Sequence, residues 1–109
     1  MDYVYIMDLI KIILVEDHPI FRRGLVELIN MEDDMEVIGE ADSVNAAIEI
    51  IKNNPPHCAV VDISLNDSNG SELVKFINTD YPEIKVLVLS MHDEKLYAER
   101  MLRAGALGY

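Results

Sequence analysis

The sequence predicts an α/β protein built on a doubly wound parallel sheet. Two observations lead to this fold class. Short apolar runs rich in Val, Ile and Leu recur along the chain, as in strands that are covered on both faces. Segments with the apolar spacing of helices separate these runs. Strand and helix therefore alternate four times, which implies right-handed crossovers between parallel strands.

The strands are expected at four apolar runs. The first, third and fourth are continuous, whereas the second belongs to a weaker stretch. The four runs are Ile12–Val15, Val37–Ile38, Cys58–Ile63 and Ile84–Leu89. In a sheet of this kind the functional crevice lies at the carboxyl ends of the strands, near the point where the strand order reverses.

Four helices are expected to follow these strands. The apolar residues that share one face of each helix are Phe21, Leu25, Leu28 and Ile29; Val44, Ala47, Ile48 and Ile51; Leu73, Phe76 and Ile77; and Ala98, Met101 and Leu102. Pro19 suits the first turn of the first helix, and Ser43 is a suitable N-cap for the second. The third helix closes before Pro82, and the fourth runs from about residue 93 to 104 and stops at Gly105.

Composition and charge exclude several classes of function before any motif is considered. The 109 residues include 20 Asp and Glu against 9 Lys and Arg, for a net charge of -11, and 50% are hydrophobic. Such a chain can bury a core as one domain, but its charge disfavours direct binding to nucleic acid or to an anionic membrane. The lone Cys58 excludes an intrachain disulfide and a Cys-rich zinc site. Because no apolar run is long enough to span a membrane and no signal-peptide pattern is present, we expect a cytoplasmic protein.

Polar residues follow three of the expected strands. Glu16 and Asp17 come after the first, Asp62 lies in the third, and Ser90 follows the fourth. Any one of these acids could simply cap a turn or helix, but together they would meet at one edge of the sheet. Crowded carboxylates repel one another unless a cation shares the site, and hard oxygen ligands suit Mg²⁺. Although an Asp in such a site can accept a phosphoryl group, the spacing alone predicts a Mg²⁺ site and leaves the reaction open.

The most specific motifs lie in four segments. They are KIILVEDHPIFRRG (11–24), VVDISLNDSNG (60–70), VLVLSMHDE (86–94) and RAGALGY (103–109). Together they resemble a response-regulator receiver domain of two-component systems, and their residues are most similar to those of the NarL/FixJ (LuxR-type) subfamily. The resemblance implies a flavodoxin-like fold with strand order 2-1-3-4. It assigns residues 10–109 to the receiver domain and residues 1–9 to an N-terminal extension and lead-in.

The resemblance implies a role for each matching position. Asp62 would accept the phosphoryl group. The implied Mg²⁺ ligands are Asp17, Asp62, the backbone carbonyl of Ser64 and, through water, Glu16. Ser90 would be the switch hydroxyl and Tyr109 the switch aromatic residue, whose movement remodels the face around the fourth helix.

Partners follow from the same resemblance. A sensor histidine kinase would supply the phosphoryl group, and the chain would act as a signalling switch that promotes its own phosphotransfer and dephosphorylation, not as a metabolic enzyme. The parent protein would regulate transcription through a C-terminal DNA-binding domain that these residues do not encode. A homodimer could form through the fourth-helix face or an open sheet edge. No membrane partner is expected.

Two departures from the family pattern keep other functions open. Asn66 stands where many receivers have Pro, and the sequence stops at Tyr109, before the expected fifth strand, fifth helix and phosphoryl-binding lysine. An apolar fourth strand left at an open edge would favour a dimerisation or protein-interaction module that does not accept phosphate. A haloacid-dehalogenase-like phosphatase is a weaker alternative, because Ser64 occupies the place of its second Asp.

The histidines do not suggest a metal centre of their own. His18 is expected on the rim of the acidic site at the start of the first helix. His57 and His92 share no ligand spacing with it, which argues against a zinc site built from the histidines. Cys58 is expected to pack as a small apolar side chain.

Overall fold

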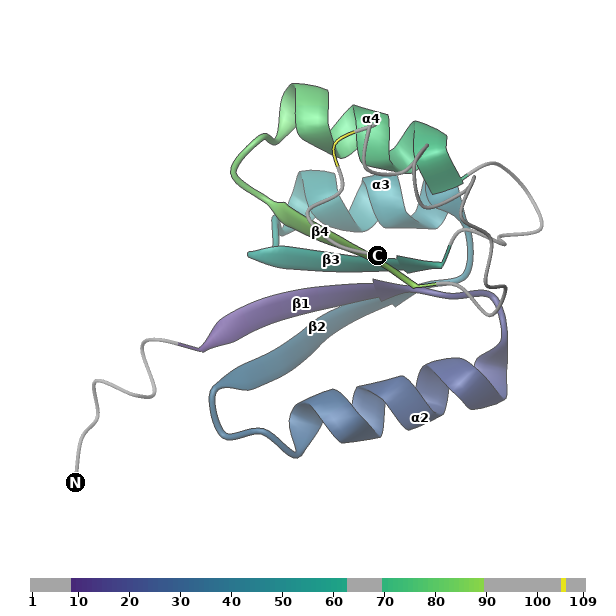
Figure 1. Ribbon diagram of the computed structural model, residues 1–109, viewed down its shortest axis with the longest axis vertical. Coiled ribbons are helices and arrows are strands. Elements are labelled where there is room, and N and C mark those ends of the chain that lie inside the picture. Colours follow the sequence, from purple (N-terminus) through teal and green to yellow (C-terminus); the bar gives the residue numbers. More distant parts are fainter. Residues whose placement is uncertain (1–8, 63–69, 90–104, 106–109) are drawn as a thin grey trace.

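The computed structural model describes residues 9–62, 70–89 and 105. Strand and helix alternate through these residues, as the sequence predicts (Figure 1). The elements are β1 (Ile10–Val15), α2 (Pro19–Asn30), β2 (Met35–Ala41), α3 (Val44–Asn53), β3 (Cys58–Asp62), α4 (Gly70–Asp80) and β4 (Lys85–Leu89). The helix expected at 93–104 lies outside the described residues. Among the helices that are described, none is long and apolar enough to cross a membrane.

The four strands form one parallel sheet in the order β2-β1-β3-β4, which confirms the predicted strand order. β1 lies between β2 and β3, with Val15 paired to Ala41 on one side and to Val61 on the other. Because all the pairings are parallel, the carboxyl ends of the four strands lie at the same edge of the sheet. The residues that follow β1 are therefore brought next to the end of β3.

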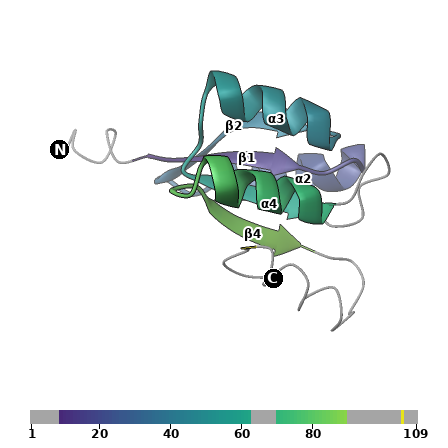
Figure 2. The same cartoon turned by 90° about the horizontal axis from the view of Figure 1, so that it is seen from above.

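Helices α3 and α4 cover one face of the sheet, and α2 lies on the other (Figures 1 and 2). Successive side chains of a strand point to opposite faces, so β1 contributes to both. Ile13 and Val15 belong to the apolar cluster under α3 and α4, whereas Ile12 and Leu14 belong to the cluster under α2. This division defines the two faces of the sheet, and the functional crevice expected from the sequence lies at the strand ends between them.

The two helices on the first face are well anchored. Ser43 caps α3 as predicted, because its Oγ accepts a hydrogen bond from the Ala46 N–H at 3.1 Å. Residues from both helices are fully buried at the sheet, and they are Ala47 and Ile51 of α3 and Leu73, Val74 and Ile77 of α4. Gly105 packs against α4 with φ +118°, and a Cβ there would lie 2.6 Å from Asn78 Cγ, so this position requires glycine.

Helix α2 packs less closely against the sheet. The prediction of which of its residues face the sheet is partly wrong. No residue of α2 is fully buried. Leu25, Val26 and Ile29 contact the sheet, but Leu28 is 62% exposed. The contacting face is centred between Leu25 and Val26, and Leu28 lies more than a quarter turn away from it. Apolar spacing alone does not show which side of a wide apolar stripe meets the sheet.

An apolar groove of about 600 Å³ lies beside α2 on this second face. Its walls are formed by the sheet and one side of the helix, and they include Ile12, Leu25, Ile29, Cys58, Val60 and Leu87. Cys58 is half-buried in this wall, so the prediction of a packed apolar thiol is confirmed only in part.

Candidate functional site

Three carboxylates meet at the carboxyl edge of the sheet, as predicted from the sequence. Asp62 is the last residue of β3, and Glu16 and Asp17 directly follow β1. Since Val15 pairs with Val61, Glu16 is carried to the position beside Asp62. The Glu16 N–H donates to the Ala41 carbonyl at 2.9 Å, which holds the loop after β1 against the end of β2.

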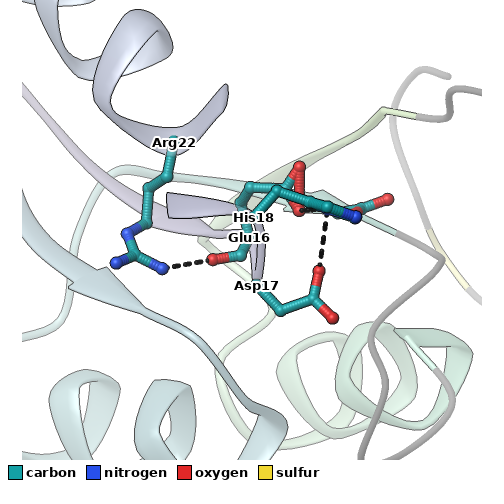
Figure 3. Close-up of polar contacts among 5 residues, drawn as sticks. Glu16, Asp17, His18 and Arg22 are labelled. Carbon is teal, nitrogen blue, oxygen red and sulfur yellow. Dashed lines mark hydrogen bonds and ion pairs between the residues drawn. The ribbon is translucent and has the colours of Figure 1, made fainter. Parts of the chain in front are cut away.

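His18 completes a cluster of four side chains. Its Nδ1 lies 3.0 Å from Asp17 Oδ1, 3.3 Å from Glu16 Oε2 and 4.0 Å from Asp62 Oδ2. Figure 3 shows the imidazole ring above the loop that carries Glu16 and Asp17. One potential ligand atom from each of the four residues lies within 4.8 Å of the others. We call these four residues the acidic cluster.

Burial makes the charge of this cluster costly. The side chains of Glu16 and Asp62 are only 1% and 4% exposed. Burial, reinforced by the neighbouring Asp62 carboxyl, raises the pKa of Glu16 to about 7, even though His18 acts in the opposite direction. The hydrogen bond to Glu16 in turn raises the pKa of His18. Closely packed carboxylates of this kind are stabilised by a cation.

The residues present fit Mg²⁺. Oxygen ligands from Asp and Glu are the ones that this ion prefers, and it commonly uses one or two protein carboxylates together with water. Within the described residues, the buried Oε1 of Glu16 has no hydrogen-bond partner, so one oxygen of the cluster is available to an ion or its water. The carboxylates of Asp17, Asp62 and Glu16 therefore lie close enough to hold one ion, and their separate ligand roles stay a prediction.

Arg22 is a structural part of the site that the sequence did not single out. Its Nη1 donates to the Glu16 carbonyl at 2.7 Å, and its Nε donates to Glu40 Oε1 at 3.2 Å (Figure 3 shows the first contact). Arg22 thereby ties the first turn of α2 to the loop after β1. The signal was its place one turn after His18, which puts it on the side of α2 that faces the loop.

Several expected site residues are not tested by this geometry. Ser64, Asn66, Ser90, His92 and Tyr109 lie outside the described residues. β4 ends beside β3, with Leu89 paired to Asp62, so the fourth strand reaches the edge that carries the acidic cluster. His57 is at the opposite edge, where its Nδ1 accepts a hydrogen bond from the Lys11 N–H at 2.9 Å.

Comparison with known proteins finds the same family along nearly the whole chain. The profile of the response regulator receiver domain matches residues 12–109. The chain is 35% identical over 100 residues to the transcriptional regulatory protein DegU of Brevibacillus brevis, covering 92% of this chain and 42% of that protein. It is 36% identical over 101 residues to the DNA-binding transcriptional activator DevR/DosR of Mycobacterium tuberculosis, covering 93% and 46%. The chain thus spans about half the length of these curated relatives.

Solved structures agree with this result. The signal receiver domain of the putative response regulator NarL from Mycobacterium tuberculosis superposes with a TM-score of 0.87 at 31% identity, covering 93% of this chain and 82% of that one. A LuxR-family two-component response regulator from Aurantimonas sp. SI85-9A1 gives a TM-score of 0.88 at 31% identity, covering 93% and 72%. The flavodoxin-like fold expected from the sequence is therefore confirmed.

Proposed function

The chain belongs to the response regulator receiver domain family, and we propose that it accepts a phosphoryl group on Asp62 with Mg²⁺ bound at the acidic cluster. The observation that carries this proposal is the meeting of three buried or nearly buried carboxylates at one edge of the sheet. Family membership supplies the class of reaction, and the cluster supplies the residues.

Each carboxylate has a separate task in this proposal. A carboxylate oxygen of Asp62 attacks the phosphorus of a phosphohistidine, so an O–P bond forms while the P–N bond breaks and the kinase imidazole leaves. Asp17 and Asp62 would hold the ion directly, and Glu16 would act through bound water. When bound, Mg²⁺ would supply positive charge that offsets the charge on the phosphoryl oxygens. Arg22 keeps the loop after β1 in place by its hydrogen bond to the Glu16 carbonyl.

The remaining roles rest on family membership. The proposal includes the backbone carbonyl of Ser64 as a metal ligand, Ser90 as the switch hydroxyl and Tyr109 as the switch aromatic residue. It also includes self-catalysed dephosphorylation and a receiver domain that extends from residue 10 to 109. Because negative charge on Asp62 would change the local electrostatics, these residues are where a conformational response would begin.

The partners are proposed on the same basis. A sensor histidine kinase would be the phosphoryl donor, and the chain would act in the cytoplasm. The relatives are transcriptional regulators, and the chain spans only about half their length, so control of transcription would act through a DNA-binding output domain. Dimerisation through the face around residues 93–104 or through the β4 edge is a further part of the proposal. The alternative of a module that does not accept phosphate is not favoured, because the carboxylates needed for phosphotransfer lie together.

Phosphorylation by a small donor tests the proposal. The chain is incubated with acetyl phosphate and Mg²⁺, and the intact mass is measured for wild type, Asp62→Asn and Asp42→Asn. Asp42 is a matched control, because it follows β2 at the same edge of the sheet but is exposed and outside the acidic cluster. Wild type and Asp42→Asn should each gain one phosphoryl group, which alkali or hydroxylamine should remove, as expected for an acyl phosphate.

The substitution at the proposed acceptor decides the outcome. Asp62→Asn should gain no hydroxylamine-labile phosphate under conditions that modify the other two proteins. Equal modification of Asp62→Asn would contradict the assignment of the acceptor. If none of the three proteins is modified by acetyl phosphate or binds the fluoroberyllate mimic, phosphoryl acceptance by this chain is wrong.

A further inference from the structure

We propose that His18 provides a nitrogen ligand to the acidic cluster, so that the site binds divalent transition-metal ions such as Co²⁺ and Zn²⁺ in preference to Mg²⁺. This inference rests on the metal site of the proposed function and deepens it. The rim position expected for His18 at the start of the first helix is confirmed, and the proposal adds to it a role in selecting the ion. The juxtaposition that carries it is an imidazole nitrogen beside three carboxylates from two strand ends.

The distances within the cluster match those between ligands of a single ion. Two ligands about 2.1 Å from a metal are about 3.0 Å apart at a right angle, about 3.4 Å apart in a tetrahedron and about 4.2 Å apart on opposite sides. The Nδ1 of His18 lies 3.0 Å from Asp17 Oδ1 and 3.3 Å from Glu16 Oε2. Its separation from Asp62 Oδ2 is 4.0 Å. An ion can therefore contact the nitrogen and the oxygens after only small side-chain shifts.

The backbone around His18 leaves its ring available to the cluster. His18 occupies the N-cap position of α2 in an extended conformation, with φ -92° and ψ 107°, and its side chain makes no capping hydrogen bond. Pro19 favours this conformation, because proline disfavours helical geometry in the residue before it. The His18 carbonyl accepts the Arg22 N–H at 2.9 Å, so the backbone is fixed while the ring lies over the carboxylates (Figure 3).

A second observation points independently to a bound ion. The side chain of Glu16 is 99% buried, and its Oε1 has no hydrogen-bond partner among the residues that the structure describes. Such an oxygen is costly to bury unless a cation or its water completes the site. By contrast, the His18 side chain is 58% exposed, which leaves the imidazole on the side of the cluster that is open to solvent.

The ligand set then determines which ions bind best. Mg²⁺ gains little from a nitrogen ligand, since it prefers oxygen and gives up its water reluctantly. Imidazole suits the later transition metals, whose affinity for mixed nitrogen and oxygen sites rises along the first row. A site with carboxylates alone would bind Mg²⁺ and Co²⁺ with a small difference in affinity. The added nitrogen is expected to widen that difference.

Metal titrations of the full chain test the role of His18. Dissociation constants for Mg²⁺, Co²⁺ and Zn²⁺ are measured by calorimetry or by competition with a chelating dye, for wild type, His18→Ala and His57→Gln. His57→Gln is the matched control, because it removes a histidine at the opposite edge of the sheet. His18→Ala should weaken Co²⁺ and Zn²⁺ binding by about tenfold or more and leave Mg²⁺ binding almost unchanged. The visible absorption of bound Co²⁺ should also change in His18→Ala and remain unchanged in His57→Gln.

The outcomes separate this inference from the proposed function. An equal effect of His18→Ala on all three ions, or none, would show that His18 is not a selective ligand. Tighter Mg²⁺ binding by His18→Ala, with no loss of Co²⁺ affinity, would show that the ring competes with the ion and would also overturn the inference. Asp17→Ala serves as the second variant. If it abolishes binding of every ion while His18→Ala has no selective effect, the metal site stands and only the inference fails.

Discussion

The two faces of the sheet are covered to different extents. Under α3 and α4, residues such as Ile51 and Leu73 are completely buried. Under α2, no helical residue is fully buried, and the apolar groove remains beside the helix. The strands themselves do not cause this difference, because Ile12 and Ile13 are both buried and point to opposite faces. Among the described residues, two helices cover one side of the sheet and one helix covers the other.

β4 shows what the unequal cover means. Val86 and Val88 face α4 and are buried, whereas Leu87 between them is 41% exposed on the groove side. A strand that is apolar in both directions is typical of a sheet covered on both faces. The apolar sequence of β4 therefore predicts that both of its faces are covered, but the described residues leave the groove side partly open.

Replacing a leucine in a helix on each face should give the largest difference between the faces in the free energy of unfolding. Leu73→Ala in α4 removes a fully buried side chain and leaves a cavity, so the free energy of unfolding should fall by about 3 kcal/mol. Leu28→Ala in α2 alters a residue that is 62% exposed and should change it by less than about 0.5 kcal/mol. Urea unfolding followed by circular dichroism measures both. Equal losses would mean that the two faces are packed equally well.

Two glycines offer a smaller contrast of the same kind. At Gly39 in β2, an added Cβ would meet the Ile50 Cγ2 at 3.0 Å, so Gly39→Ala should destabilise the chain by about 1 kcal/mol through overpacking. At Gly24 in α2, nothing lies within 4 Å of the added atom. Gly24→Ala should stabilise the chain by about 0.5 to 1 kcal/mol, because alanine favours the helix and restricts the unfolded chain.

The signs of the two changes form the test. Thermal unfolding should give a lower Tm for Gly39→Ala and a higher Tm for Gly24→Ala than for wild type. A rise for Gly39→Ala would show that Ile50 moves aside without cost and that the packed face tolerates an extra carbon. A fall for Gly24→Ala would mean that α2 is more tightly constrained than its surroundings suggest.

The groove itself should be detectable by an apolar dye. Leu87→Lys places a charge in its wall at a position that is already partly exposed, so dye fluorescence should drop while stability changes little. Leu28→Lys is the matched control, because Leu28 is exposed on α2 but does not line the groove. If both substitutions reduce the fluorescence equally, the dye reports general surface apolarity and the groove is not a distinct binding surface.

The sequence was most informative about the positions of the strands and about the residues brought together at the strand ends. The apolar runs predicted the four strands, and the acids that follow them predicted the meeting of Glu16, Asp17 and Asp62. The exposed position of Leu28 was not predictable, because a wide apolar stripe fits several helix orientations. The contacts that Arg22 and the His18 ring make with the loop after β1 depend on how closely α2 approaches that loop. The periodicity of the sequence does not contain this information.

Thiol accessibility gives the smallest but most local comparison of the faces. Cys58 is half-buried in the groove wall, and its burial raises the pKa of the thiol, so less reactive thiolate is present at neutral pH. Iodoacetamide should therefore modify Cys58 more slowly in the native chain than in the unfolded chain. The native chain should react without unfolding first, and the rate of modification should rise with pH.

Val61→Cys in a Cys58→Ala background places a thiol on the same strand at a fully buried position facing α3 and α4. That thiol should react only as fast as the chain unfolds, and its rate should rise steeply with low concentrations of urea while that of Cys58 stays nearly constant. The same urea dependence at both positions would mean that the groove side is as closed as the packed side.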